Sequence, residues 1–203
     1  MKDEPPQTRI QKKNTDMILQ AGLEVFSTYG FRGSTLDQIA ESAGLSKPNL
    51  LYYFRSKDAI YVALLAGLMD EWLAPLRAVD AAGDPLEENL SYVRRKLQMS
   101  RDFPQESRLF ANEMIQGAPH IKPILDGDLK SLVDAKIHVI EDWVRAGKIA
   151  QVNPHHLIFS IWSLTQHYAD FDVQVRAILD GQEPFDEAGE FLEQLYRKML
   201  TVA

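Results

Sequence analysis

The chain has 203 residues, of which 45% are hydrophobic and 25% charged, so it can bury a substantial core as one or two globular domains. It contains no cysteine, which excludes disulfides and thiolate metal sites and suits a reducing cytoplasm. Its apolar runs are far short of the roughly 18 residues that span a bilayer and no signal peptide precedes them, so we expect a cytoplasmic protein without membrane contact.

Helical periodicity runs through almost the whole chain, without the alternating pattern of strands or a hairpin turn signal between them. Residues 1–7 are polar and contain two prolines, which predicts a disordered arm. The first helix is expected from about Thr8 to Tyr29 and ends at Gly30.

The segment from Thr35 to Lys57 predicts two short helices around a glycine turn, followed by a third helix. Thr35 and Gln38 have the spacing of a capping box, and Gly44 falls where a helix ends in a left-handed conformation. Ser46 is a second N-cap, Pro48 lies in the first turn that follows, and Ser56 caps the helix that begins at Lys57. This pattern is typical of a helix-turn-helix, whose second helix enters the DNA major groove.

The remaining segments also read as helices, which makes the predicted fold all-α with about nine helices. They are expected from Ser56 past Trp72, with Pro75 kinking or ending the helix, and then over 85–101, 104–116, 122–145, 154–179 and from 184 to about 200. We therefore predict a three-helix DNA-binding domain over 1–57 and a helical effector-binding and dimerisation domain over 58–203.

The charge is divided between these two parts. Residues 1–57 hold eight Lys/Arg against six Asp/Glu, a net charge of +2, while the rest hold fourteen against twenty-three, a net charge of −9; together these give −7. A mildly basic head on an acidic body is expected if only the head meets DNA phosphates. Because the head is only weakly basic, two copies acting together are needed, and we expect a homodimer.

Several head residues are candidates for contact with double-stranded DNA. Lys47, Pro48 and Asn49 form the first turn of the predicted recognition helix, where lysine can pair with guanine and asparagine with adenine. Tyr52 and Tyr53 are candidates for hydrogen bonds to phosphate, although one of them can instead pack against the first helix. Phosphate sites are also expected at the helix starts marked by Ser34 and Thr35 and by Lys57. Arg9, Lys12 and Lys13 can follow the DNA backbone or stay solvated, whereas Leu50, Leu51 and Phe54 are expected in a small core.

The stretch from Phe26 to Tyr61, FSTYGFRGSTLDQIAESAGLSKPNLLYYFRSKDAIY, resembles the DNA-binding head of the TetR family of regulators. Leu51 stands where many members carry tyrosine. Three segments of the body, EWLAPL (71–76), SRLFANEMIQGAP (107–119) and HLIFSIWSLTQHYADF (156–171), are similar to the RutR-type pyrimidine-utilisation repressors of that family. The resemblance implies a ligand-responsive repressor with uracil or thymine as effector, no cofactor, and Tyr52 as the better phosphate contact.

Trp162 and Gln166 lie four residues apart and share one helix face. An indole plane beside an amide can stack on a flat heterocycle and bond its edge, and Trp72 can supply a second wall. The alternative is that these tryptophans belong to an ordinary core; the resemblance favours ligand binding. Asn112, Glu113 and Lys96 are further polar candidates.

The last two helices are the expected dimer interface, because the first of them is apolar nearly all round and must be buried on both sides. The interface candidates are Phe159, Tyr168, Phe191, Leu195 and Met199. No metal site is expected from His155, His156 and His167, whose spacing is wrong for shared coordination, and no catalytic motif is found. Two alternatives remain open: the same repressor with a more hydrophobic effector, and a helical ligand-binding enzyme or adaptor that does not bind DNA.

Overall fold

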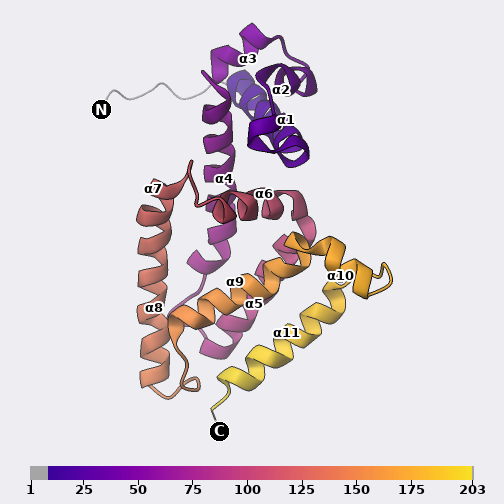
Figure 1. Cartoon of the computed structure of the whole chain (residues 1–203). Coiled ribbons are helices and arrows are strands. Elements are labelled where there is room, and N and C mark those ends of the chain that lie inside the picture. Colours follow the sequence, from indigo (N-terminus) through magenta and orange to yellow (C-terminus); the bar gives the residue numbers. More distant parts are fainter. Residues whose placement is uncertain (1–8, 203) are drawn as a thin grey trace, which may run out of the picture.

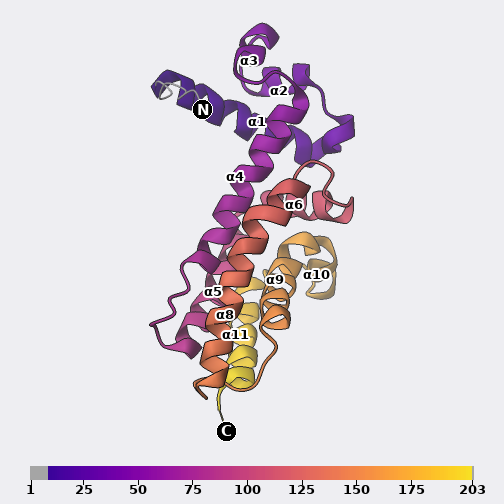
Figure 2. The same ribbon diagram turned by 90° about the vertical axis from the view of Figure 1, so that its left-hand side faces the viewer.

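A computed structural model describes residues 9–202, so the arm predicted over residues 1–7 lies outside the described part of the chain. Over that range the secondary structure is helical and contains no strand (Figures 1 and 2). The elements are α1 (Arg9–Gly33), α2 (Leu36–Ser42), α3 (Lys47–Tyr53), α4 (Lys57–Arg77), α5 (Pro85–Asp102), α6 (Pro104–Ile115), α7 (Lys122–Ile124), the π-helical turn η1 (Leu125–Leu129), α8 (Lys130–Arg145), α9 (Pro154–Asp170), α10 (Asp172–Ile178) and α11 (Phe185–Leu200). The predicted all-α class is confirmed.

The first three helices form a head at one end of the molecule, and α4 runs from it into the body (Figure 1). The caps expected from the sequence form as predicted. The Thr35 amide donates to Gln38 Oε1 over 2.8 Å, and the Gln38 amide donates back to Thr35 Oγ1 over 3.2 Å. Gly44 has a φ of 65°, and Gly30 breaks α1 with a φ of 68° and ψ of 170°, so the regular part of α1 ends where the sequence predicts.

The long helix α4 is shared by head and body. Ile60, Leu64 and Leu68 belong to one buried cluster together with Phe26 of α1 and Leu109 of α6. With its 21 residues α4 is long and apolar enough to cross a membrane, but it is a buried core helix whose apolar side chains pack against its neighbours. Pro75 lies in the last turn of α4 and does not interrupt it.

The body departs from the expected helices in two places. The segment expected as one helix over 122–145 contains the π-helical turn η1, where Gly127 weakens the α-helical pattern. The segment expected over 154–179 is divided at Phe171, whose φ of −115° and ψ of 29° are not helical. Contacts from α6 explain this break, because Ser107 donates its hydroxyl to the Asp170 carboxylate and Arg108 donates to the Ala169 carbonyl at the end of α9.

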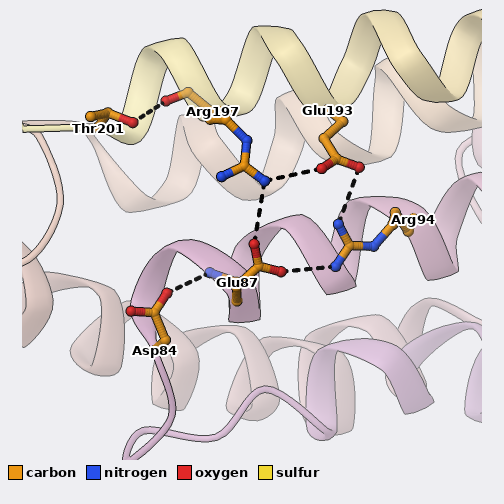
Figure 3. Close-up of polar contacts among 6 residues, drawn as sticks. All are labelled: Asp84, Glu87, Arg94, Glu193, Arg197 and Thr201. Carbon is orange, nitrogen blue, oxygen red and sulfur yellow. Dashed lines mark hydrogen bonds and ion pairs between the residues drawn. The ribbon is translucent and has the colours of Figure 1, made fainter.

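A network of charged side chains joins α5 to α11 along the outside of the body (Figure 3). Glu87 accepts from Arg94 over 3.1 Å and from Arg197 over 3.3 Å, while Glu193 accepts from the same two arginines over 3.2 and 3.0 Å. Each pair is exposed and contributes little by itself, but the closed network fixes α5 lengthwise against α11. That alignment helps to position the buried residues of α5, among them Tyr92 and Lys96.

Candidate DNA interface and effector cavity

The first turn of α3 presents polar side chains to solvent. Lys47, Pro48 and Asn49 are all exposed, and the Ser46 hydroxyl accepts the Asn49 amide over 3.3 Å. The Lys47 ammonium lies 2.9 Å from the Asp37 carboxylate of α2, with both side chains exposed. An exposed pair of this kind is weak enough for the lysine to exchange a carboxylate for a base edge or a phosphate. The three residues therefore remain candidates for DNA contact.

The second half of α3 distinguishes the two tyrosines. Tyr52 is 72% exposed, whereas the Tyr53 hydroxyl accepts a 2.6 Å hydrogen bond from Asn14 of α1. Leu50 is fully buried, but the expectation that Leu51 joins the same core is wrong, because its side chain is exposed. One residue along a helix turns the side chain by about 100°, which takes Leu51 away from the face that Leu50 buries. Tyr52 and Leu51 therefore lie on the open side of the recognition helix.

The starts of α2 and α4 are tied together inside the head. Lys57 Nζ donates to the carbonyl oxygens of Phe31, over 2.6 Å, and of Ser34, over 2.8 Å. The Ser34 hydroxyl is buried and donates to the Gly30 carbonyl over 2.6 Å. Both side chains thus hold the turn before α2, and Thr35 caps that helix. At these helix starts the groups available to a phosphate are therefore chiefly the backbone amides.

The body contains a small cavity in which three of the predicted ligand-binding residues meet. Trp72 of α4 and Trp162 and Gln166 of α9 line a space of about 60 Å³. Lys96 of α5 also faces this cavity, and the sequence ranked it only as a secondary candidate. The remaining lining residues are apolar: Met69, Leu73, Phe110 and Leu129. Aromatic and apolar walls with a few polar groups are the usual composition of a small-molecule site.

Lys96 is unusual in this site because it is a lysine buried among apolar side chains. Its side chain is 3% exposed, and its ammonium lies 4.0 Å from the centre of the Trp72 ring. Burial lowers the pKa of Lys96 to about 7, and the charge of Asp170 opposes that shift only in part. A donor that is held in an apolar pocket beside a flat ring is well placed to bond a carbonyl oxygen or an anionic group of a ligand.

Tyr92 fixes one wall of the cavity, and the sequence did not identify it. The Trp162 indole N–H donates to the Tyr92 hydroxyl over 2.6 Å. Tyr92 is buried, and the burial raises its pKa, so the hydroxyl stays neutral. A usable signal was present in the sequence, because Asn89, Tyr92, Lys96 and Ser100 place polar groups at helical spacing along the buried side of α5.

Asn112 lies at a different place from the other predicted ligand residues. It is exposed and lines an open cleft of about 840 Å³ beside the cavity. The cleft and the cavity share Phe110, Leu129, Trp162 and Gln166, so the two spaces adjoin each other at these side chains. Asn112 therefore remains a candidate only for the outer part of a ligand site.

Glu113, also a secondary candidate, faces the junction between head and body. Its buried carboxylate accepts the His120 amide over 2.7 Å and lies 3.1 Å from His120 Nδ1. The His120 ring packs on Phe31 of the head and on Tyr61 of α4, with ring centres 4.4 and 4.9 Å apart. Helix α6 thus contributes Phe110 to the lining of the cavity, and its Glu113 contacts the head through His120.

The residues predicted for the dimer interface are exposed to different degrees. Phe159 and Phe191 are exposed by 46% and 57%, Leu195 and Met199 by 36% and 37%, and Tyr168 is half-buried. Exposed aromatic and aliphatic side chains on two neighbouring helices are typical of an association surface. Across residues 9–202 no group of three or more His, Asp or Glu side chains is arranged to hold a metal ion.

A helix-turn-helix head carried by a long helix, above a helical body that encloses a cavity, defines a ligand-responsive DNA-binding regulator. The family model for bacterial regulatory proteins of the TetR family matches residues 18–64, and the model for the C-terminal region of YcdC-like proteins matches residues 65–203. The chain belongs to the TetR family of transcriptional regulators.

Individual relatives agree with this assignment. The chain is 55% identical over 161 residues to the HTH-type transcriptional regulator RutR of Escherichia coli K12 and to that of Shigella flexneri, covering 79% of this chain and 76% of theirs. Among solved structures, a TetR-family regulatory protein from Rhodococcus RHA1 has a TM-score of 0.76 at 20% identity over 94% of this chain and 98% of its own. AibR, in complex with isovaleryl coenzyme A and operator DNA, has a TM-score of 0.71 at 16% identity over 90% and 97%. The family and the RutR relatives are transcriptional regulators and not enzymes, which decides against the alternative of a helical enzyme or adaptor.

Proposed function

We propose that this protein is a cytoplasmic, homodimeric repressor that leaves its DNA operator when a pyrimidine, uracil or thymine, occupies the cavity between α4, α5 and α9. The observation that carries the proposal is the meeting of Trp72, Trp162, Gln166 and Lys96 around one cavity. The similarity to RutR supports the same assignment.

The chemistry of these four side chains matches a pyrimidine ring. The two indole planes offer stacking surfaces, which suits a flat heterocycle. The Gln166 amide has one donor and one acceptor at its end, and uracil presents alternating carbonyl and N–H groups that such an amide pairs in a bidentate manner. Lys96 supplies a further donor for a second carbonyl. A purely hydrophobic effector, the rival within the family, would leave the buried ammonium and the amide without partners, which costs about 1–3 kcal/mol for each neutral group and more for a charged one.

The DNA side of the proposal depends on the open face of α3. Asn49 is exposed in the first turn of the recognition helix, and Tyr52 extends further along the same helix with 72% exposure. Two such helices related by a two-fold axis would read two half-sites about one helical turn apart. A ligand that binds better to one spacing of the heads lowers operator affinity by that difference in binding.

The direct test is operator binding with and without uracil at two salt concentrations. Wild type should bind an operator fragment, lose affinity on addition of uracil, and lose about 10³–10⁵-fold between 50 and 200 mM salt if six to ten phosphates are contacted. Asn49→Ala should lose operator affinity while uracil still raises its melting temperature. Gln166→Leu should keep operator binding but stop responding to uracil.

The same experiment separates the proposal from its rivals. If neither uracil nor thymine at millimolar concentration changes the melting temperature or the operator affinity of wild type, the effector is not a pyrimidine. If Asn49→Ala binds the operator as wild type does, the assignment of the recognition helix is wrong.

A further inference from the structure

One side of the open cleft beside the cavity is lined by α9 and by Phe171, the residue that follows it. Phe159, Ser163, His167 and Phe171 follow one another at intervals of four residues, and all four line the cleft of about 840 Å³. All four are exposed. The opposite side of α9 is buried in the body through Leu157, Ile161, Thr165 and Ala169. The exposed row of α9 is therefore the outer part of the α9 wall of the cleft, whose other residues are Trp162, Gln166 and Asp170.

The neighbouring helix α11 carries a second exposed apolar row. Phe191, Leu195 and Met199 recur at intervals of four residues while Leu192 and Tyr196 are buried, and none of the three exposed residues lines the cavity or the cleft. Soluble monomers seldom leave such aromatic and aliphatic rows uncovered. Two antiparallel pairs of such helices bury one another in a two-fold four-helix interface.

We infer that the second subunit of the dimer lies over this cleft and closes the outer side of the effector site. This rests on the dimer and the effector cavity proposed above. A partner that packs on the exposed row of α9 must contact Phe159, Ser163 and His167, and these residues are the rim of the cleft. An interface that buries the row therefore also covers the cleft.

The small size of the cavity indicates how a second subunit over the cleft would affect effector binding. The cavity volume of about 60 Å³ is well below the roughly 300–1,000 Å³ of typical small-molecule pockets. Uracil, with eight non-hydrogen atoms, needs more room, and the side chains of Phe110, Leu129 and Gln166, which the cavity shares with the cleft, can provide it by moving toward the cleft. In a monomer that movement exposes apolar surface to water, whereas in the dimer the partner covers it. Effector binding and dimerisation should therefore strengthen each other.

The test is uracil binding by a variant that cannot dimerise. The double variant Phe191→Glu/Leu195→Glu places two charges on the α11 row without changing any residue of the cavity or the cleft. Ile10→Glu is the matched control, since Ile10 is a 71% exposed apolar residue of the head. Sedimentation gives the oligomeric state, circular dichroism the fold, and titration calorimetry the affinity for uracil. We expect the control to match wild type and the folded, monomeric double variant to bind uracil at least 10-fold more weakly.

A folded monomer that binds uracil as tightly as the dimer overturns the inference and leaves the proposed effector intact. If the double variant does not fold, the dissociation constant of the wild-type dimer is measured with and without saturating uracil. Tighter association in uracil supports the inference, and an unchanged constant overturns it. A wild-type protein that stays monomeric, or a dimer that binds no uracil, overturns the proposed function itself and the inference that rests on it.

Discussion

Replacing the buried lysine of the cavity should stabilise the protein, and do so most at acidic pH. Lys96 is 3% exposed, and burial lowers its pKa from 10.5 to about 7. In the unfolded chain the same lysine keeps its ordinary pKa. Between these two values the unfolded state binds more protons than the folded state, so the stability of the wild-type protein rises with pH across this window. Methionine has a similar length, is apolar and does not titrate, so Lys96→Met removes this dependence.

The magnitude follows from the two pKa values. Near pH 6 the lysine is charged in both states, and the folded state bears nearly the whole cost of the buried charge, about 5 kcal/mol. Near pH 9.5 the folded lysine is neutral, and the cost falls to between about 1 and 2 kcal/mol. Lys96→Met should therefore gain about 3 kcal/mol more, relative to wild type, at pH 6 than at pH 9.5. For a chain of this length that corresponds to a difference of about 6–12 °C in melting temperature.

The assay is thermal and urea unfolding of both proteins at the two pH values, without effector and at one protein concentration, because dimerisation makes stability depend on concentration. Lys130→Met is the control, since Lys130 is 66% exposed and forms only a surface pair with Asp134. Its effect should differ by less than about 0.5 kcal/mol between the two pH values. A Lys96→Met effect that changes by less than about 1 kcal/mol between pH 6 and pH 9.5 would refute the argument that Lys96 is held in a desolvated site.

Three further predictions concern the supports of the site and the head. Tyr92→Phe removes the acceptor of the Trp162 indole N–H, so uracil affinity should fall by about 1–3 kcal/mol in calorimetry while helicity is retained; unchanged affinity would show that Tyr92 does not position the wall. Glu113→Gln weakens the hold on His120 at the head–body junction, so operator affinity should respond less to uracil in a fluorescence titration, and a wild-type response would count against coupling through α6. Thr35→Ala removes a helix cap, so the free energy of unfolding should fall by about 1 kcal/mol in urea, and no loss would mean that Gln38 alone suffices.

Local features of the fold could be predicted from the sequence, because their causes lie within a few residues. The hydroxyls of Ser46 and Ser56 cap α3 and α4 as expected, since capping depends only on the residues that follow. The break at Phe171 could not be predicted, because it depends on Ser107 and Arg108, which are far away in the chain. The exposure of Leu51 could not be predicted, because its apolar side chain resembles that of its buried neighbour Leu50.

In the cavity, too, features with local causes could be predicted and features that depend on distant residues could not. The spacing of Trp162 and Gln166 predicts that they share one helix face. Trp72 is a candidate because it lies in a segment that resembles known repressors. The sequence does not indicate Tyr92 and offers Lys96 only as a secondary candidate, because a polar residue on a buried helix face has no fixed local pattern. Its partners are supplied by other helices, and only the packing of α4, α5 and α9 reveals them.

The length of α4 determines how far a small rotation at the cavity would move the head. Trp72 lies fifteen residues beyond Lys57, which at 1.5 Å per residue separates the cavity from the head by about 22 Å of continuous helix. A tilt of about 5° about the cavity end moves the head end by about 2 Å. Hydrogen bonds to base edges tolerate only about 0.5 Å of change in distance. A rotation of a few degrees at the cavity is therefore large enough, at the far end of α4, to break hydrogen bonds between the recognition helix and base edges.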